Sequence, residues 1–377
     1  RKARRPAFTG LQQFSMAARR SGGGLRLLVI LAQASAGLPS SRLAEDLLVY
    51  NRVHKSGSST MQHILSAAAR EHSFRYEPSF EFTRHRLDGR ARAELVKSIT
   101  SRKRPFAYDR HIYYMSFAVH GSPEPTYINL VRDPVRRGVS GFYYLRDCIC
   151  VKRGDWCRDQ WKLREDDPAY CARDINAAYA DVPEPPPDLP LAKRPLLPYF
   201  CGHEEVCVVP PSAALANSTG ATADSPSEAL HRARVHMRDR YAWIGVLEEM
   251  PLSLRVLVAT LPRWFGRIDV HCWQRTVEQP ADAVRGGLAS RLWAWIRSGG
   301  ALGAAARGHP APNADTARKM RAQLRLEYEV YEYARLLLHE RAQALNVSLV
   351  AQDISRRDYA YRGRTTTASD CHRAQQD

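Results

Sequence analysis

Two segments of this chain repeat one order of local patterns: an apolar run, a short polar loop and a helical run. The first apolar run, residues 47–53, leads into a Ser/Gly loop and a helical stretch over 59–70. The second, residues 126–131, is followed by the turn Arg132-Asp133-Pro134 and a helical stretch over 135–146. Strands that alternate with helices predict an α/β fold with a parallel sheet flanked by helices.

The rest of the chain adds further elements and two interruptions. Residues 241–247 and 251–261 form a third candidate strand and helix, and residues 318–345 return to helical periodicity. Residues 183–198 contain seven prolines, which predict an extended surface loop. Residues from about 275 to 311 are rich in Ala, Gly and Arg, and we interpret them as an insertion.

The charge balance narrows the class of partner. The chain has 56 Lys and Arg against 39 Asp and Glu, a net charge of +17. This predicts an acidic partner, which could be nucleic acid, an anionic membrane or an acidic glycan. A composition of 44% hydrophobic and 25% charged residues excludes a wholly disordered chain and a multispan membrane protein.

The cysteines and two sequons indicate a secretory compartment. The eight cysteines form no pair of close CxxC motifs with zinc-finger spacing, and their even number is compatible with disulfides. Asn217-Ser218-Thr219 and Asn346-Val347-Ser348 are N-glycosylation sequons. Together these features favour a lumenal protein and argue against a nucleic-acid-binding one.

The N-terminal region carries an incomplete targeting signal in our interpretation. The chain starts with Arg1, and its apolar run at 25–38 follows Arg19 and Arg20. This run is shorter than the roughly 20 residues that a membrane-spanning helix needs. We interpret it as the remnant of a signal anchor, with a buried helix as the alternative.

Two loops at the ends of predicted strands are suited to anions. A loop between a strand and a helix offers backbone N–H groups, hydroxyls and a lysine charge to a phosphate. It lacks the spacing of a Walker A loop, and an ordinary polar turn is the alternative interpretation. The residues of this loop are Lys55, Ser56, Gly57, Ser58, Ser59 and Thr60.

A second loop favours the anion-binding interpretation of the first. Arg132 ends the strand at 126–131, and Ser140 follows about two helical turns later, so both side chains could face one anion. A structural ion pair between Arg132 and Asp133 is the alternative. Two anion loops on parallel strands predict a nucleotide with two phosphorylated positions.

Several motifs in order resemble the uronosyl 2-O-sulfotransferases, the family of heparan sulfate 2-O-sulfotransferase, dermatan/chondroitin uronyl 2-O-sulfotransferase and arthropod pipe-like proteins. The resemblance runs from about Leu47 to Ala344. Its motifs are Tyr50-Asn51-Arg52-Val53-His54-Lys55, Tyr127-Ile128-Asn129-Leu130-Val131-Arg132-Asp133-Pro134, Pro198-Tyr199-Phe200-Cys201-Gly202-His203, Gly245-Val246-Leu247-Glu248-Glu249, Pro262-Arg263-Trp264-Phe265 and Glu327-Tyr328-Glu329-Val330-Tyr331-Glu332-Tyr333.

The resemblance implies a P-loop-like sulfotransferase fold and a reaction. The sulfuryl group of 3′-phosphoadenosine 5′-phosphosulfate (PAPS) would move to the 2-hydroxyl of a hexuronic acid in heparan sulfate or a related glycosaminoglycan. The 5′-phosphosulfate loop would be residues 52–60, with Lys55 beside the sulfuryl group. Arg132 and Ser140 would hold the 3′-phosphate, and Arg52 would face the acceptor's carboxylate or sulfates.

The family's catalytic histidine falls on His111, which would accept the proton of the acceptor hydroxyl. His54 and His203 lie in matched motifs and are its rivals. No metal is expected, since Lys55 and the loop N–H groups can meet the charge on the leaving phosphate. The resemblance also implies a disulfide between Cys201 and Cys207.

Further expectations follow from the resemblance. We expect a sulfotransferase domain over 47–345, a basic N-terminal segment over 1–46 and a tail over 346–377. A type II Golgi membrane protein with a lumenal catalytic domain, and a homotrimer, are also implied. The stretch Arg307-Gly308-His309-Pro310-Ala311-Pro312 departs from the family's C-terminal cofactor loop. The alternatives are a catalytically impaired glycan-binding protein of the same fold and a dermatan/chondroitin-specific enzyme.

Overall fold

The computed structural model describes residues 43–148, 150, 171–180, 195–208, 224–268, 270 and 309–347. Within them, one sheet has the strand order β2-β3-β1-β4-β5, and every neighbouring pair is parallel. This confirms the predicted α/β fold with a parallel sheet. The strands are β1 (Leu43–Asn51), β2 (Arg75–Pro78), β3 (Phe106–Arg110), β4 (Glu124–Val131) and β5 (Tyr241–Val246).

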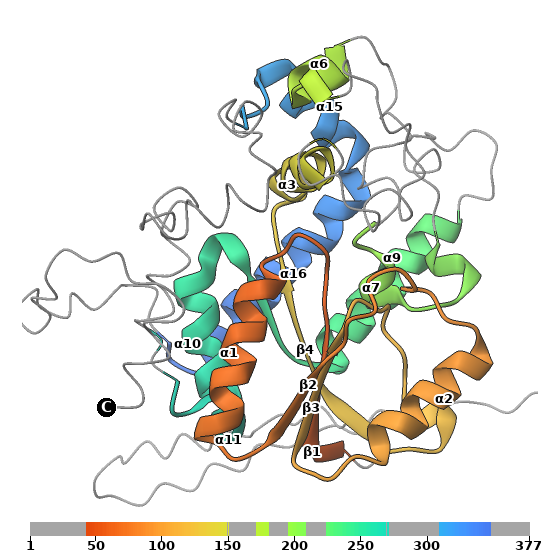
Figure 1. Cartoon of the computed structure of the whole chain (residues 1–377), viewed down its shortest axis with the longest axis vertical. Helices are drawn as coiled ribbons and strands as arrows, with labels where there is room; N and C mark the ends of the chain where they lie inside the picture. Colours follow the sequence, from red (N-terminus) through yellow and green to blue (C-terminus); the bar gives the residue numbers. More distant parts are fainter. Residues whose placement is uncertain are drawn as a thin grey trace, which may run out of the picture. The chain divides into compact units, whose positions relative to one another are not determined.

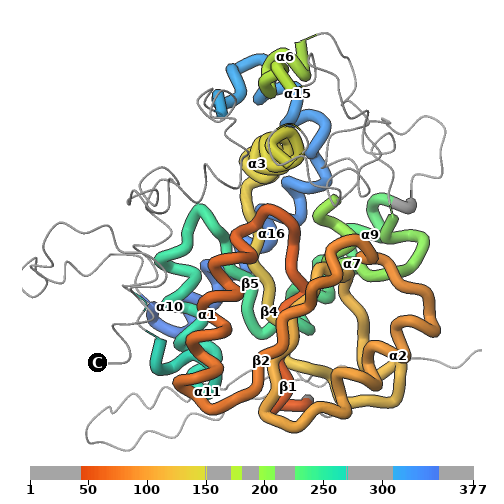
Figure 2. Tube along the Cα trace, in the orientation of Figure 1, coloured from red at the N-terminus to blue at the C-terminus, as the bar shows by residue number. Residues whose placement is uncertain are grey.

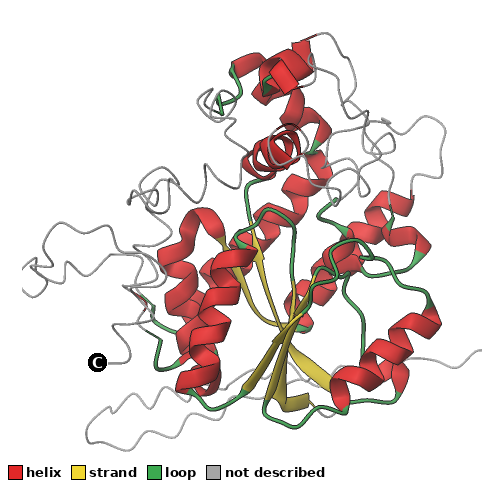
Figure 3. Cartoon of the chain, viewed as in Figure 1, coloured by secondary structure: helices red, strands yellow, loops and turns green. Residues whose placement is uncertain are grey.

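Helices cover both faces of the sheet, which explains the continuous apolar run in β1. Its residues Leu47, Leu48, Val49 and Tyr50 are all at most 2% exposed, as expected for a strand buried on both faces. Figures 1 and 3 show α1 (Ser58–Glu71), α10 (Met250–Thr260) and α11 (Pro262–Phe265) along one side. The other side carries α2 (Gly89–Thr100), α7 (Pro198–Cys201) and α9 (Asp224–Asp239).

The strand order indicates where on the sheet a ligand is expected to bind. From β1 the chain passes through α1 to β2 and β3 on one side, and then crosses to β4 on the other side of β1. In open parallel sheets, ligands bind outside the carboxyl ends of the strands where the order reverses in this way. The loops after β1 and β4 meet at this point.

A buried polar network joins β1, β4 and β5. Asn129 on β4 donates to the backbone oxygen and the side-chain oxygen of Asn51 on β1, at 2.7 and 2.9 Å. Tyr241 on β5 donates to the same side-chain oxygen at 3.0 Å. Asn51 in turn donates to the carbonyl of Tyr199 on α7 at 2.8 Å. Because unpaired buried polar groups are costly, these bonds fix the register of β1, β4 and β5.

A smaller apolar cluster stands apart from the main core. It joins α3 (Pro134–Asp147), α6 (Ile175–Ala180) and α15 (Ala314–Gln323), which lie beyond the carboxyl ends of the strands in Figure 2. The cluster therefore holds the C-terminal region against the helix that follows the Arg132 turn. Its buried members are Val135, Phe142, Tyr143, Ile175, Ala178, Tyr179 and Met320.

The predicted helical stretch at 318–345 is two helices in the structure. It is divided at Leu324, with φ −96° and ψ 23°, between α15 and α16 (Arg325–Ala344). The N-terminus of α15 is capped by Asn313, whose side chain accepts from Thr316 N–H at 2.8 Å. Helical periodicity continues across the break, so the sequence pattern did not reveal it.

Two disulfides join cysteines that are both in the described part of the chain. Cys201 and Cys207 are bonded, with Cα atoms 5.4 Å apart, which confirms the predicted pair. Cys207 ends the short helix η3 (Glu205–Cys207). Cys150 is bonded to Cys171, and Cys148 is also in a disulfide. Cys157, Cys272 and Cys371 lie outside the described residues.

Other sequence expectations fall partly or wholly outside the described part of the chain. These are the N-terminal segment to residue 42, most of the proline-rich loop, the insertion up to residue 308, Asn217 and the tail after residue 347. Across the ranges that are described, the helices are all too short or too polar to cross a bilayer.

Candidate functional site

The loop after β1 is wrapped tightly around the start of α1. Lys55 and Gly57 both have positive φ, 60° and 77°. A Cβ atom on Gly57 would lie 2.9 Å from Leu247 Cδ1 and 3.2 Å from Leu130 Cδ2. Glycine is therefore favoured there by both backbone conformation and space. The bend brings residues 55–57 directly to the N-terminus of α1, where backbone N–H groups and the helix dipole favour an anion.

Arg132 joins this loop to the turn after β4. Its NH1 group donates to the carbonyl oxygen of Lys55 at 3.3 Å. Its Nε atom lies 3.9 Å from Oε1 of Glu248. Burial lowers the pKa of the Arg132 guanidinium, and the carboxylate of Glu248 opposes that shift. The two loops that the sequence predicts to bind anions are therefore adjacent, as expected for loops that follow neighbouring parallel strands.

Helix α3 brings Ser140 toward the same region. The Nζ atom of Lys55 lies 3.9 Å from the centroid of the Tyr144 ring, a cation–π contact across the two loops. Ser140 is half-buried and precedes Tyr144 by four residues in α3. Since residues four apart share a helix face, Ser140 lies on the face that contacts Lys55.

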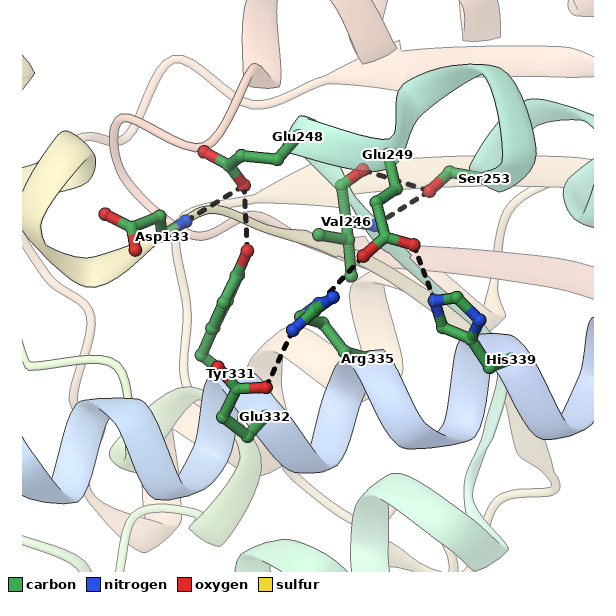
Figure 4. A network of polar contacts seen from close by, with 9 residues as sticks. All are labelled: Asp133, Val246, Glu248, Glu249, Ser253, Tyr331, Glu332, Arg335 and His339. Atoms are coloured by element: carbon green, nitrogen blue, oxygen red, sulfur yellow. Dashed lines mark hydrogen bonds and ion pairs between the residues drawn. The ribbon is translucent and has the colours of Figure 1, made fainter. Parts of the chain in front are cut away.

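The segment after β5 is hydrogen-bonded to the Arg132 turn (Figure 4). In the short helix η4 (Leu247–Glu249), the carboxylate of Glu248 accepts from the backbone N–H of Asp133 at 3.0 Å and from the Tyr331 hydroxyl at 3.3 Å. Asp133 caps α3 by accepting from Arg136 N–H at 2.8 Å. The motif at 245–249 thus contacts both anion loops.

Three histidines from separate segments gather on the other side of the β1 loop. The rings of His54 and His111 are stacked, with centroids 3.6 Å apart and planes 8° apart. The Nε2 atoms of His54 and His85 are 2.6 Å apart. Two Nε2 atoms at this distance share a single proton, so one of the two rings must present a lone pair there. His85 was not predicted from the sequence, because it lies outside the motifs that carry the family resemblance.

The backbone fixes the tautomer of His111. Its Nδ1 atom lies 3.0 Å from the carbonyl oxygen of Arg52, and a carbonyl can only accept a hydrogen bond. The Nδ1–H group is therefore the donor, and in the neutral ring the Nε2 atom carries the lone pair. This is the arrangement that a general base needs.

His203, the second rival, has the opposite arrangement. Its Nδ1 atom accepts from the backbone N–H of Leu87 at 3.0 Å, so the neutral ring carries its proton on Nε2. Burial, with the nearby charge of Arg92, lowers the pKa of His203 to about 4. The ring is thus neutral at physiological pH but presents no lone pair beyond the one that Leu87 occupies.

Arg52 lies inside the protein next to the histidines. Its side chain is 2% exposed, with Nε 3.2 Å from Oδ1 of Asp109, and its NH2 group donates to the carbonyl of Ser79 at 2.9 Å. Tyr76 donates to the other oxygen of Asp109. Burial raises the pKa of the Asp109 carboxyl, and Arg52 opposes that shift.

The altered C-terminal loop contacts α3. The His309 ring stacks on Tyr143 with centroids 4.4 Å apart, and its Nε2 atom lies 3.1 Å from Oδ2 of Asp147. The Tyr143 hydroxyl donates to the carbonyl of Pro310 at 2.8 Å. Residues 309–310 are therefore held near the helix of Ser140 despite their departure from the family pattern.

One of the two predicted glycosylation sites can be placed. Asn346 follows α16 with φ 53° and is exposed, so its side chain is accessible to a glycosylating enzyme. Among the residues that the structure describes, no cluster of three His, Cys, Asp or Glu side chains could hold a metal ion.

Comparison with known proteins shows a matching family model and several relatives of this chain. A family model described as "Sulfotransferase family" matches residues 43–184, from β1 to beyond α6. Uronyl 2-sulfotransferase of Mus musculus is 26% identical over 341 residues, which cover 85% of this chain and 71% of the relative. Heparan sulfate 2-O-sulfotransferase 1 of Gallus gallus is 30% identical over 225 residues, covering 58% of this chain and 56% of that protein.

A third relative, "Uronyl 2-sulfotransferase homolog pip" of Drosophila melanogaster, is 26% identical over 253 residues, 62% of this chain and 45% of the relative. The matched family region contains β1, β4 and the two loops that meet at the carboxyl edge of the sheet. From this agreement between sequence and architecture, we conclude that residues 43–184 form a domain of the sulfotransferase family and that the chain is a sulfotransferase.

Proposed function

We propose that this sulfotransferase moves the sulfuryl group of PAPS to the 2-hydroxyl of a hexuronic acid in heparan sulfate or a related glycosaminoglycan. The observation that carries the proposal is the hydrogen bond from Arg132 to the carbonyl of Lys55, which joins two anion loops at one sheet edge. Such a pair suits a nucleotide phosphorylated at both its 5′ and 3′ positions. The named relatives act on uronyl groups or on heparan sulfate.

The loop after β1 would hold the 5′-phosphosulfate. Lys55 and the N–H groups at the start of α1 supply positive charge where the leaving phosphate becomes more negative. Ser56, Ser58, Ser59 and Thr60 supply hydroxyls in the same loop and first turn. Arg132 and Ser140 would bind the 3′-phosphate, and their positions at the adjacent turn and on the Tyr144 face of α3 support this assignment.

His111 is the proposed general base. The acceptor hydroxyl oxygen attacks sulfur, the bond from sulfur to the leaving phosphate oxygen breaks, and the hydroxyl proton moves to Nε2 of His111. The bond from Nδ1 to the Arg52 carbonyl supports this role, because it leaves the lone pair on Nε2. The same criterion disfavours His203, whose lone pair is used by Leu87.

The acceptor sugar is proposed to lie near the 79–85 loop, next to the buried ion pair of Arg52 and Asp109, so that the Arg52 charge would act on it from inside the protein. The Arg52 guanidinium lies 5.9 Å from the Phe82 ring, which in turn is 6.1 Å from the His111 ring. These contacts support a place for the acceptor sugar near the 79–85 loop. The net charge of +17 is suited to a polyanionic glycan.

The Golgi location, the N-terminal anchor, the domain limits and the homotrimer remain proposals. Exposed Asn346 and the disulfides support a lumenal location. Residues 1–42, in which an anchor would lie, are outside the described part of the chain.

The proposal is tested by incubating the purified chain with PAPS and with desulfated heparan, dermatan or chondroitin acceptors, followed by disaccharide analysis. We expect PAPS-dependent appearance of 2-O-sulfated uronic acid. An acceptor that already carries sulfate at every uronic 2-position is the matched control and should gain none. Glycan binding without any sulfate transfer would instead indicate the catalytically impaired protein, which the comparisons do not favour.

A further inference from the structure

Glu248 occupies a junction between the two anion loops and the C-terminal helix. One carboxylate oxygen, Oε2, accepts from the Asp133 N–H and the Tyr331 hydroxyl. The other, Oε1, lies 3.9 Å from Nε of Arg132. The Glu248 side chain is 19% exposed and that of Arg132 27%, so water screens this ion pair only in part.

The neighbouring Glu249 shows that this placement is specific. Its carboxylate accepts from Arg335 at 2.7 Å and lies 2.6 Å from Nε2 of His339, both on α16 (Figure 4). Glu248 therefore bridges the Arg132 turn and Tyr331 of α16, whereas these contacts of Glu249 are to α16 alone.

The bonds to Oε2 determine where the charge of Oε1 is directed. Asp133 and Tyr331 come from separate elements, and together they limit rotation of the Glu248 carboxylate. Oε1 then faces one edge of the Arg132 guanidinium, while NH1 of the same group is bonded to the Lys55 carbonyl. The planar guanidinium is therefore hydrogen-bonded through NH1 and attracted at its Nε edge by the Glu248 charge, which together favour one orientation.

We propose that Glu248 is a positioning residue that holds Arg132 in the orientation in which it binds the nucleotide's 3′-phosphate. The inference rests on the proposed function, which assigns that phosphate to Arg132. An arginine that is oriented before the ligand arrives loses less side-chain freedom on binding. For Glu248 to strengthen binding of the 3′-phosphate, this benefit has to exceed the repulsion between the Glu248 carboxylate and the phosphate.

The experiment measures, by titration calorimetry, the affinities of full-length variants for 3′-phosphoadenosine 5′-phosphate and for AMP, which lacks the 3′-phosphate. The ratio of the two affinities isolates the 3′-phosphate. We expect Glu248→Ala to lower this ratio about tenfold, within the range for residues that share a network. Glu248→Gln, which retains an acceptor for Asp133, should lower it less.

Glu249→Gln is the matched control, because it changes the adjacent carboxylate without touching the Arg132 turn. It should leave the ratio unchanged. Arg132→Ala should lower the ratio by itself, and adding Glu248→Ala to it should lower the ratio no further. The denaturation midpoint of each variant shows whether it is folded, and Glu248→Gln gives the result if Glu248→Ala does not fold.

The outcomes separate this inference from the proposed function. If Arg132→Ala lowers the ratio but neither Glu248 variant does, the positioning role is wrong and the phosphate assignment stands. The role is also wrong if Glu248→Gln raises the ratio, since repulsion of the phosphate then dominates. If Arg132→Ala leaves the ratio unchanged, the 3′-phosphate does not bind at Arg132, and both proposals fail.

Discussion

Replacing Arg137 with methionine should destabilise the protein strongly, because Arg137 neutralises a buried carboxylate. Arg137 on α3 is 1% exposed, and its NH2 group lies 2.7 Å from Oε2 of Glu327, which is 9% exposed on α16. The other Glu327 oxygen accepts from the Leu196 N–H at 2.6 Å. Removing one partner of a buried pair leaves an uncompensated charge, which costs about 3–5 kcal/mol of unfolding free energy.

A matched exposed pair tests whether burial causes this cost. Arg234 and Glu329 also lie 2.6 Å apart, but their side chains are 40% and 47% exposed. Arg234→Met should therefore cost no more than about 1 kcal/mol, as is usual for surface pairs. The assay is urea denaturation at pH 8, followed by circular dichroism, on the full chain.

The pH dependence gives a second readout. Burial raises the pKa of the Glu327 carboxyl, while Arg137 opposes that shift. Without Arg137 the pKa rises further, so the folded variant binds a proton more tightly than the unfolded chain does. That stabilisation is complete below the unfolded pKa and is lost as pH rises through the folded pKa. The destabilisation by Arg137→Met, relative to wild type, should therefore be smaller at pH 5 than at pH 8.

Adding Glu327→Gln to Arg137→Met should restore part of the lost stability, since the amide still accepts from Leu196 but carries no charge. The reasoning is refuted if Arg137→Met costs less than about 1 kcal/mol at pH 8, or if its cost is the same at both pH values.

Three further predictions concern the reaction and its compartment. His111→Ala should lower turnover about 10²- to 10⁴-fold while PAPS and glycan affinities persist, and His203→Ala should not; steady-state kinetics that reverse this order would exclude His111 as the base. Lys55→Ala should lower turnover about 10²- to 10³-fold and nucleotide affinity less, because its charge acts mainly on the leaving phosphate; near-normal turnover of the folded variant would remove Lys55 from the site. Chain secreted from animal cells should carry a glycan on Asn346 or Asn217, and peptide mapping that finds both asparagines bare would argue against a lumenal protein.

The sequence predicted the elements whose signals are local. The apolar run of β1, the Ser/Gly loop and α1 are consecutive, and so are β4, the Arg132 turn and α3. The short strand β2 and helix α2 were not predicted: β2 has no buried residue, and α2 has only two, Val96 and Ile99. Without a sustained apolar pattern, neither element produces a clear period in the sequence.

What the sequence by itself determined was the parallel α/β class and the positions of the two loops that are proposed to bind anions. Strand and helix periods, and the residue types of a loop, depend only on neighbouring residues. Only the tertiary structure decided which distant side chains meet. His54, His85 and His111 lie on separate segments, and Glu248 reaches the Arg132 turn from η4, the short helix that follows β5. Such contacts depend on the order of strands in the sheet, and strand order is set by the packing of the whole core, which no local pattern records.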